Sequence, residues 1–295
     1  MPATFQGLIS VSELQNSLSD PKLRIIDCRF RLMEQDWGLA VYQRSHISGA
    51  VYAHLDRDLA GPVTAISGRH PLPAKSHFLQ RLARWGIKSD TRIVCYDHEG
   101  GVLAVRLWWM LRHWLGFEQV QVLNGGWSAW LEHAGDLESG DALTPEVQPM
   151  TCETDQNSWL STARIVANLE AGEYRLLDAR SSERFAGLQE PIDTVAGHIP
   201  LALNRPLTEN LTGKAFFKPA AQLRDEFSAL LHGRVRPEQV VHTCGSGVTA
   251  CHNLFAMELA GLSGSKLYPG SWSEWIRDPK RPIVSTPSAT HPEWV

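Results

Sequence analysis

The sequence lacks the features of a membrane protein, a secreted protein or a nucleic-acid-binding protein. No apolar run approaches the roughly 20 residues that a membrane-spanning helix needs, and the first residues, MPATF, have no basic region followed by an apolar one. The net charge is only −4, which leaves no basic surface for nucleic acid. We therefore expect a cytoplasmic protein that binds neither membrane nor nucleic acid.

Cysteine is scarce and scattered. The five cysteines are Cys28, Cys95, Cys152, Cys244 and Cys251. An odd number without regular spacing favours reduced thiols over a disulfide framework. The sequence has neither a C-x-x-C pair nor a histidine-rich cluster, and the spacing of Cys244, Cys251 and His252 matches no usual zinc site. We expect neither a metal nor another cofactor.

The sequence of 295 residues contains an internal repeat with two copies. Related segments recur with an offset of about 150 residues. A repeat this long indicates two copies of one domain and not a solenoid array. The paired segments are Arg24–Arg29 and Arg175–Arg180, His46–Ala50 and His198–Ala202, Arg92–Asp97 and Gln239–Cys244, and Val122–Trp130 and Leu267–Trp275.

Each copy alternates short apolar runs with helical patterns, which predicts an α/β fold with a mainly parallel sheet flanked by helices. We predict strands at 23–27, 92–96, 120–123, 176–178, 240–243 and 266–268. We predict helices at 11–18, 76–85, 102–115, 162–170, 220–231 and 249–259. A polar stretch without periodicity separates the copies. The predicted division is a first domain over 1–135, a linker over 136–157 and a second domain over 158–295.

The candidate active site is the loop between the strand at 240–243 and the helix at 249–259. It reads CGSGVT, from Cys244 to Thr249. Sites of parallel α/β folds lie at the carboxyl ends of strands, and a glycine-rich turn at a helix N-terminus presents N–H groups to an anion. Both features favour the cysteine thiolate, which is the nucleophilic form. The local pattern fits an incidental cysteine in a strand–turn–helix equally well.

The two copies together resemble a tandem rhodanese. Each copy has a D-x-R strand end, beginning at Asp27 or Asp178, a turn that starts with a histidine, and a G-x-W ending. The CGSGVT loop is similar to the persulfide-forming loop of the 3-mercaptopyruvate sulfurtransferase branch, whereas the thiosulfate branch usually carries basic residues after its cysteine. The resemblance implies an inactive first domain, a catalytic second domain and a site between them. Asp97 aligns with Cys244, and we expect Asp97 to be a turn or helix-cap residue.

The resemblance also implies roles for residues around the cysteine. Cys244 is the nucleophile, and Ser246 hydrogen-bonds the sulfur or passes a proton to the departing enolate. Arg184 binds the anionic donor, since a guanidinium suits a carboxylate or a thiosulfate oxygen. Thr249 is a candidate cap of the following helix and a donor to the sulfur. The loop residues expected at the substrate are Gly245, Gly247, Val248 and Thr249.

Two stretches of the first copy provide further candidates. The resemblance implies that a histidine of the first domain and an acidic residue form a proton relay to the serine; His46 matches this histidine, with Asp36 as its acidic partner. However, His198 occupies the same turn in the second copy, which indicates a structural residue. Arg69 and His70 lie in a loop that is a candidate to reach the domain boundary and add positive charge.

The predicted function is sulfur transfer from 3-mercaptopyruvate through a persulfide on Cys244, with ping-pong kinetics. The expected partners are a small anionic sulfur donor and a thiol acceptor, such as thioredoxin or glutathione, or cyanide. A phosphatase is disfavoured, because its C-x5-R pattern would require arginine where Ala250 stands.

The choice of donor stays open. Mercaptopyruvate enzymes often carry a second arginine after a Glu-Pro pair, but Glu190-Pro191 is followed here by Ile192 and Asp193. The alternatives are a thiosulfate:cyanide sulfurtransferase and a non-enzymatic module that relays a persulfide.

Overall fold

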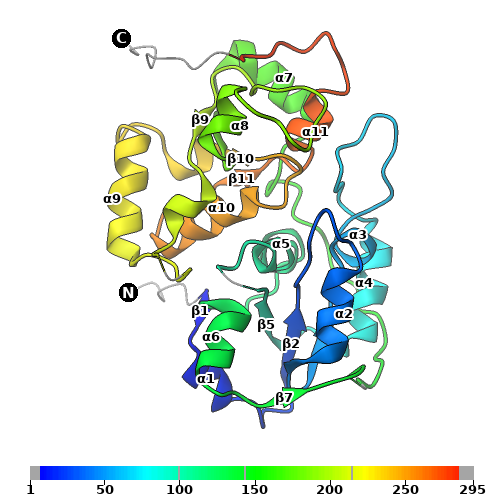
Figure 1. The fold of residues 1–295 in the computed structure, drawn as a ribbon. Helices are drawn as coiled ribbons and strands as arrows, with labels where there is room; N and C mark the ends of the chain where they lie inside the picture. Colours follow the sequence, from blue (N-terminus) through cyan, green and yellow to red (C-terminus); the bar gives the residue numbers. More distant parts are fainter. Residues whose placement is uncertain (1–6, 99, 143, 214, 286–295) are drawn as a thin grey trace.

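Two parallel sheets organise the structure, a computed structural model that describes residues 7–98, 100–142, 144–213 and 215–285 (Figure 1). The strand order of the first sheet is β1 (Leu8–Ile9), β6 (Val120–Leu123), β5 (Arg92–Tyr96), β2 (Leu23–Asp27) and β4 (Ala50–Tyr52). The strand order of the second is β11 (Lys266–Leu267), β10 (Val240–Thr243), β8 (Arg175–Asp178) and β9 (Leu203–Asn204).

Corresponding strands have the same order in both sheets. β2 pairs with β5 in parallel, as β8 pairs with β10. Trp159 forms an isolated parallel bridge to Leu267 of β11, in the position that β1 takes beside β6. The predicted repeat and the predicted parallel α/β architecture are therefore confirmed.

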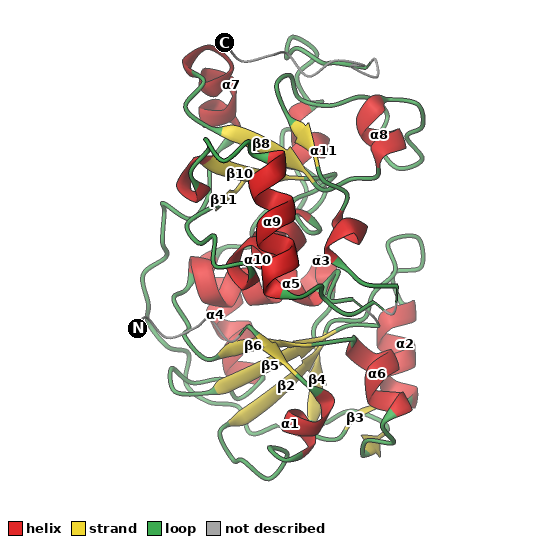
Figure 2. Ribbon diagram, turned by 90° about the vertical axis from the view of Figure 1, so that its left-hand side faces the viewer, coloured by secondary structure: helices red, strands yellow, loops and turns green. Residues whose placement is uncertain are grey.

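Helices flank both sheets (Figure 2). In the first half they are α1 (Val11–Gln15), α2 (Trp37–Arg44), α3 (Leu55–Asp58), α4 (Lys75–Arg84), α5 (Ala104–Trp109), the π-helical turn η1 (Met110–Trp114) and α6 (Gly126–Glu132). In the second half they are α7 (Thr162–Ala171), α8 (Ser182–Ala186), η2 (Leu207–Asn210), α9 (Ala220–Leu230), η3 (Pro237–Gln239), α10 (Ala250–Leu259) and α11 (Ser271–Trp275). In the described ranges, no helix combines the length and the apolar character needed to cross a membrane.

The helix predicted at 102–115 is not a continuous α-helix. It starts at Ala104, and η1 follows Trp109. The N–H of Leu115 donates to the carbonyl oxygen of Met110, five residues back, at 3.1 Å. Sequence periodicity missed this turn, because the large side chains of this helix are buried almost all round it and a π-turn buries the same residues.

The segment predicted as a linker contains a short strand. β7 (Leu137–Glu138) pairs antiparallel with β3 (His46–Ile47). The carboxylate of Glu138 also accepts hydrogen bonds from Ser48 Oγ at 2.7 Å and from the N–H of Gly49 at 3.0 Å. The start of the segment is thus attached to the first domain. At the other end of the chain, residues 286–295 of the predicted second domain lie outside the described residues.

The two domains share one hydrophobic core. Helix α5 of the first packs against α10 of the second, and Figures 1 and 2 both show these helices side by side between the sheets. At their contact, Trp108 meets Phe255 edge to face with ring centroids 4.6 Å apart. Because both side chains are fully buried, the boundary between the domains is packed like a domain interior.

The D-x-R strand ends make the same contacts in both copies. In the first, Arg29 Nη2 lies 2.6 Å from Asp27 Oδ2, and the guanidinium lies 4.2 Å from the ring centroid of Trp127. The second copy repeats this arrangement with Asp178, Arg180 and Trp272. A contact present in the copy with the cysteine and in the copy without it supports the architecture of the domain and not the chemistry.

Candidate functional site

Cys244 lies at the carboxyl end of β10, where the parallel fold places a site. Its side chain is only 1% exposed. The backbone of Cys244 is fixed by the first residues of α11: the N–H of Cys244 donates to Ser271 Oγ at 3.1 Å, and the N–H of Trp272 donates to the carbonyl oxygen of Cys244 at 3.0 Å. The loop from Cys244 to Thr249 then leads into α10.

The two glycines of the loop lie close to neighbouring groups. The N–H of Gly247 donates to Cys244 Sγ at 3.2 Å, with φ at +75°, and a Cβ there would lie 2.2 Å from the carbonyl oxygen of Pro269. A Cβ at Gly245 would lie 2.9 Å from Arg69 Nη2 and 3.5 Å from Arg184 Nη2. The backbone therefore requires glycine at Gly247, whereas a side chain at Gly245 would displace the flexible ends of the two arginines.

Three other residues near the cysteine lie in different settings. Val248 is buried in the shared core. Thr249 stands at the N-cap position of α10, but its side chain makes no capping hydrogen bond, so the expected cap is not formed. The Sγ of Cys251 donates to the carbonyl oxygen of Gly247 at 3.5 Å, and burial raises the pKa of this thiol to about 12. Cys251 is thus an inert buried thiol.

Ser246 belongs to a chain of three polar side chains that spans both domains. Its Oγ lies 2.7 Å from His70 Nδ1, and His70 Nε2 lies 3.0 Å from Asp56 Oδ1. The bond to His70 lowers the pKa of Asp56, so the carboxylate accepts. His70 Nε2 then carries the proton, and its Nδ1 accepts from the Ser246 hydroxyl.

Burial lowers the pKa of His70 below its ordinary value of 6.5, although Asp56 opposes this shift. The ring is therefore neutral at neutral pH, and the lone pair of its Nδ1 is directed at the Ser246 hydroxyl. A neutral imidazole in that position is able to act as a general base, and the carboxylate behind it would stabilise the imidazolium ion that forms. His70 was expected only as a source of positive charge, and Asp56 was missed.

His46 and Asp36 do not form the expected relay. His46 Nδ1 contacts the carbonyl oxygen of Tyr42 at 2.8 Å, and its ring stacks on the Tyr42 ring. Asp36 is exposed and pairs with Arg57 at 3.2 Å. The strand that carries His46, β3, lies at the far end of the first domain from β10 (Figure 2). The structure thus brings His70, and not His46, to Ser246.

The second copy explains why the histidine of this turn recurs. His198 Nδ1 contacts the carbonyl oxygen of Phe185 at 2.7 Å, and its ring stacks on the Phe185 ring. This is the environment that His46 has with Tyr42. The shared histidine is a structural residue of the fold.

Two arginines from different domains lie over the cysteine loop. Arg184, from α8, binds the carboxylate of Glu190, with Nη2 2.7 Å from Oε1. Arg69 comes from the segment between α3 and α4, which extends from the first domain towards α11 (Figure 1). The N–H of Arg69 donates to Ser273 Oγ at 3.0 Å, and its guanidinium pairs with Asp193. Both guanidinium groups are near enough to Gly245 to bind an anion in front of the loop.

A third arginine lies behind the loop and was not found from the sequence. Arg106 of α5 is fully buried. Its Nη1 donates to the carbonyl oxygen of Gly247 at 3.1 Å and its Nη2 to that of His70 at 3.2 Å. It therefore connects the cysteine loop to the histidine. The signal in the sequence was one arginine in an otherwise apolar helix, which is a costly residue to bury.

Asp97 directly follows β5, as Cys244 directly follows β10. Its carboxylate accepts hydrogen bonds from the N–H groups of Gly101, Leu103 and Ala104, the last at 3.0 Å. Asp97 thus caps the start of α5, in agreement with the expected role.

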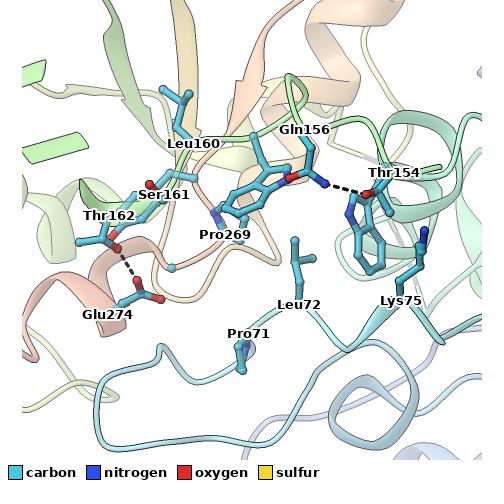
Figure 3. A pocket seen from close by; sticks show the side chains of 14 residues that line it. Pro71, Leu72, Lys75, Thr154, Gln156, Leu160, Ser161, Thr162, Pro269 and Glu274 are labelled. Carbon is cyan, nitrogen blue, oxygen red and sulfur yellow. Dashed lines mark hydrogen bonds between the residues drawn. The ribbon is translucent and has the colours of Figure 1, made fainter. Parts of the chain in front are cut away.

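A cavity of about 400 Å³ lies beside this site at the domain boundary (Figure 3). Pro269, which packs against Gly247, and Pro71, which follows His70, belong to its wall. Cys244 and Ser246 are not among its lining residues, so the cavity adjoins the sulfur site and does not contain it. Within the described ranges, no group of histidine, cysteine and acidic side chains is arranged to hold a metal ion.

Comparison with known proteins agrees with the repeat. The family description "Rhodanese-like domain" matches residues 10–133 and 161–278. A probable 3-mercaptopyruvate sulfurtransferase of Pseudomonas aeruginosa is 45% identical over 94% of this chain and 98% of its own. A putative thiosulfate sulfurtransferase of Mycobacterium tuberculosis is 38% identical over 96% of this chain and 98% of its own. The solved 3-mercaptopyruvate sulfurtransferase from Leishmania major has a TM-score of 0.81 and 31% identity, covering 92% of this chain and 74% of that one.

Proposed function

The chain belongs to the rhodanese-like family, with two copies in tandem, and is a sulfurtransferase; we propose that it takes sulfur from 3-mercaptopyruvate and passes it through a persulfide on Cys244 to a thiol or to cyanide. The observation that carries the choice of donor is the chain of Ser246, His70 and Asp56. We assign these three residues to proton transfer, in place of His46.

The need for protons separates the two donors. Loss of sulfur from mercaptopyruvate leaves the enolate of pyruvate, which must be protonated. Loss of sulfur from thiosulfate leaves sulfite, a stable anion that needs no proton. A serine held 2.7 Å from a neutral, carboxylate-backed imidazole supplies proton transfer that only the first donor requires.

The proposed step conserves protons within the site. The Cys244 thiol gives its proton through Ser246 to His70 Nδ1, and the resulting thiolate attacks the donor sulfur. The Sγ–S bond forms as the C–S bond breaks, and the electron pair of that bond leaves on the enolate. His70 then returns the proton through Ser246, which yields pyruvate and the persulfide. The N–H of Gly247 stabilises the anionic sulfur.

The donor carboxylate is proposed to bind on the side of the site where Arg184 and Arg69 lie. Arg184 and Arg69 place their guanidinium nitrogens closest to a Cβ built at Gly245, and we assign the neighbouring loop residues from Gly247 to Thr249 to the same donor site. The first domain provides Arg69 and His70 although it has no nucleophile. We therefore propose that residues 1–135 are a catalytically inactive domain that completes the site of residues 158–295, with 136–157 as the linker.

The acceptor is proposed to be small. Because Cys244 is only 1% exposed, glutathione or cyanide reaches the persulfide more readily than the thiol of a protein such as thioredoxin. The five cysteines are free in the structure, which supports a reducing, cytoplasmic location.

The test is a comparison of kcat/KM for mercaptopyruvate and thiosulfate in the same buffer with cyanide as acceptor. We expect the larger value for mercaptopyruvate, with stoichiometric pyruvate release. Cys244→Ser should abolish transfer from both donors, while circular dichroism shows an intact fold. Retained transfer in this variant would overturn the persulfide mechanism, and a larger value for thiosulfate would overturn the choice of donor. A module that only relays persulfides would release no pyruvate.

A further inference from the structure

Asp193 lies between the two arginines that face the cysteine loop. Its Oδ1 pairs with Arg69 Nη1, and its Oδ2 lies 3.4 Å from Arg184 Nη2. The Asp193 side chain is only 5% exposed. One carboxylate of the protein thus bridges the two cationic side chains that come from different domains.

This bridge is close to the position that an anionic donor must take. Both guanidinium groups come within 4 Å of a Cβ built at Gly245, the residue after the nucleophile. A donor whose sulfur reaches Cys244 therefore has its own anionic group near the same guanidinium nitrogens. The donor and Asp193 compete for hydrogen bonds from these nitrogens.

The charges around the bridge balance. Arg184 is paired with Glu190 as well as with Asp193, and Arg69 is paired with Asp193. The backbone of Asp193 is held in place too, because its N–H donates to Glu190 Oε1 at 3.1 Å. Glu190 also pairs with Arg180, which is paired in turn with Asp178. Three arginines are thus matched by three carboxylates, so the cluster has no net positive charge with which to attract a donor.

We propose that Asp193 is a specificity-determining residue that holds the place of the donor anion between Arg69 and Arg184 and disfavours donors of higher negative charge. The proposal rests on the proposed function, since it concerns the same site. A donor binds by displacing the Asp193 carboxylate from the guanidinium groups. A monoanion such as mercaptopyruvate meets less repulsion from that carboxylate than a dianion such as thiosulfate.

The size of the effect follows from the charges. Removal of one negative charge near the site favours a dianion by twice the Coulomb energy that it gives a monoanion at the same position. The logarithm of the gain should therefore be twice as large for thiosulfate. If Asp193→Asn raises kcat/KM for thiosulfate by about tenfold, the gain for mercaptopyruvate should be about threefold.

The experiment measures KM for both donors in two variants. Asp193→Asn keeps the shape of the side chain but removes its charge, and Asp193→Ser replaces it with a side chain too short to bridge the two arginines. We expect lower KM values for both donors in both variants, with the larger change for thiosulfate. A rise in KM would overturn the proposal, because it would show that Asp193 serves to hold the arginines in place. Equal gains for the two donors would also overturn it.

A matched control is Glu183→Gln. Glu183 is an exposed carboxylate on α8, the helix that carries Arg184. This change removes one negative charge, as Asp193→Asn does, but from the helix that carries Arg184 and without touching the bridge. We expect unchanged KM values. A gain equal to that of Asp193→Asn would assign the effect to long-range charge and overturn the role of Asp193.

A binding measurement separates this inference from the proposed function. In the inactive Cys244→Ser background, calorimetry measures the affinity for sulfite and for pyruvate, with and without the additional Asp193→Asn substitution. Tighter sulfite binding in the double variant supports the role of Asp193 even if the wild-type enzyme transfers no sulfur from either donor. Unchanged or weaker binding overturns it, whatever the transfer assay shows.

Discussion

Replacement of His70 by asparagine tests the proton relay directly. Ser246 Oγ lies 2.7 Å from His70 Nδ1, and the amide group of asparagine reaches about the same point from the backbone as Nδ1 does. His70→Asn therefore keeps a hydrogen-bonding partner for Ser246 but removes the group that accepts and returns the proton.

The expected loss depends on the donor. A positioned general acid–base contributes about 10²- to 10⁴-fold to a rate, and the enolate of pyruvate needs the returned proton. We expect His70→Asn to lower kcat/KM for mercaptopyruvate by at least about 10²-fold. The loss for thiosulfate should be much smaller, because sulfite leaves without a proton. Stopped-flow measurement of pyruvate and sulfite release during a single turnover reports both steps.

The dependence on pH gives a second readout. Burial lowers the pKa of His70 below 6.5, so the ring is neutral above that pH and gains a proton as the pH falls through its pKa. Transfer from mercaptopyruvate in the wild-type enzyme should therefore decline in this acidic range. His70→Asn should remove that decline.

His46→Asn is the matching variant for the relay expected from the sequence. His46 is 1% exposed and contacts Tyr42, so this change should affect stability and leave the donor preference of the folded enzyme unaltered. A selective loss of mercaptopyruvate transfer in His46→Asn, with none in His70→Asn, would refute the reasoning. An equal loss of both donors in His70→Asn would make His70 a structural residue.

Two further predictions concern stability. Burial lowers the pKa of His252 to about 4, so between pH 6.5 and 4 the unfolded chain binds a proton that the folded chain does not, and the free energy of unfolding should fall as the pH falls. In urea titrations across this range, His252→Gln should reduce the pH slope by up to about 1.4 kcal/mol per pH unit, and an unchanged slope would exclude His252 as the source. Trp108→Ala should destabilise the protein by about 3–5 kcal/mol, because Trp108 is fully buried against Phe255. Leu131→Ala, at a position 47% exposed, is its control, and a loss below about 1 kcal/mol for Trp108→Ala would contradict the shared core.

Six strands of the two parallel sheets could be predicted, because each is marked by a pattern of neighbouring residues in the sequence. Four predicted strands have the observed bounds, and the other two, β8 and β11, differ by one residue at one end. Short runs of apolar, β-branched residues between polar ones carry that information. The strands β1, β4 and β9 of these sheets were not predicted, and neither were β3, β7 and the π-turn η1. Two-residue strands are defined by their partner, and that partner lies about 90 residues away for β3 and β7.

The site shows the same difference between what neighbouring residues reveal and what only distant contacts reveal. The loop around Cys244 is a continuous motif, so its resemblance to the rhodanese family could be recognised from the sequence, and that resemblance implied a persulfide site. The partner of Ser246 is 176 residues away, and nothing near His70 marks it as a base. The family resemblance drew attention to His46 instead, although the recurrence of this histidine as His198 indicated a structural residue. Residues that recur in both copies support the structure of the domain, as the equivalent contacts of His46 and His198 show.

The same comparison explains how the first copy contributes to the site although Asp97 stands where the second copy has Cys244. Asp97 accepts three backbone N–H groups at the end of β5, so a fixed carboxylate occupies the anion-binding turn of the first domain. In the second domain the sulfur of Cys244 accepts the N–H of Gly247, and a sulfur atom can extend by a second sulfur where a carboxylate cannot. The first domain is then free to contribute side chains that one domain alone does not provide. Arg106 and His70 contact the loop across the domain boundary. The packing of α5 against α10 positions Arg106, which in turn binds the carbonyl oxygen of His70.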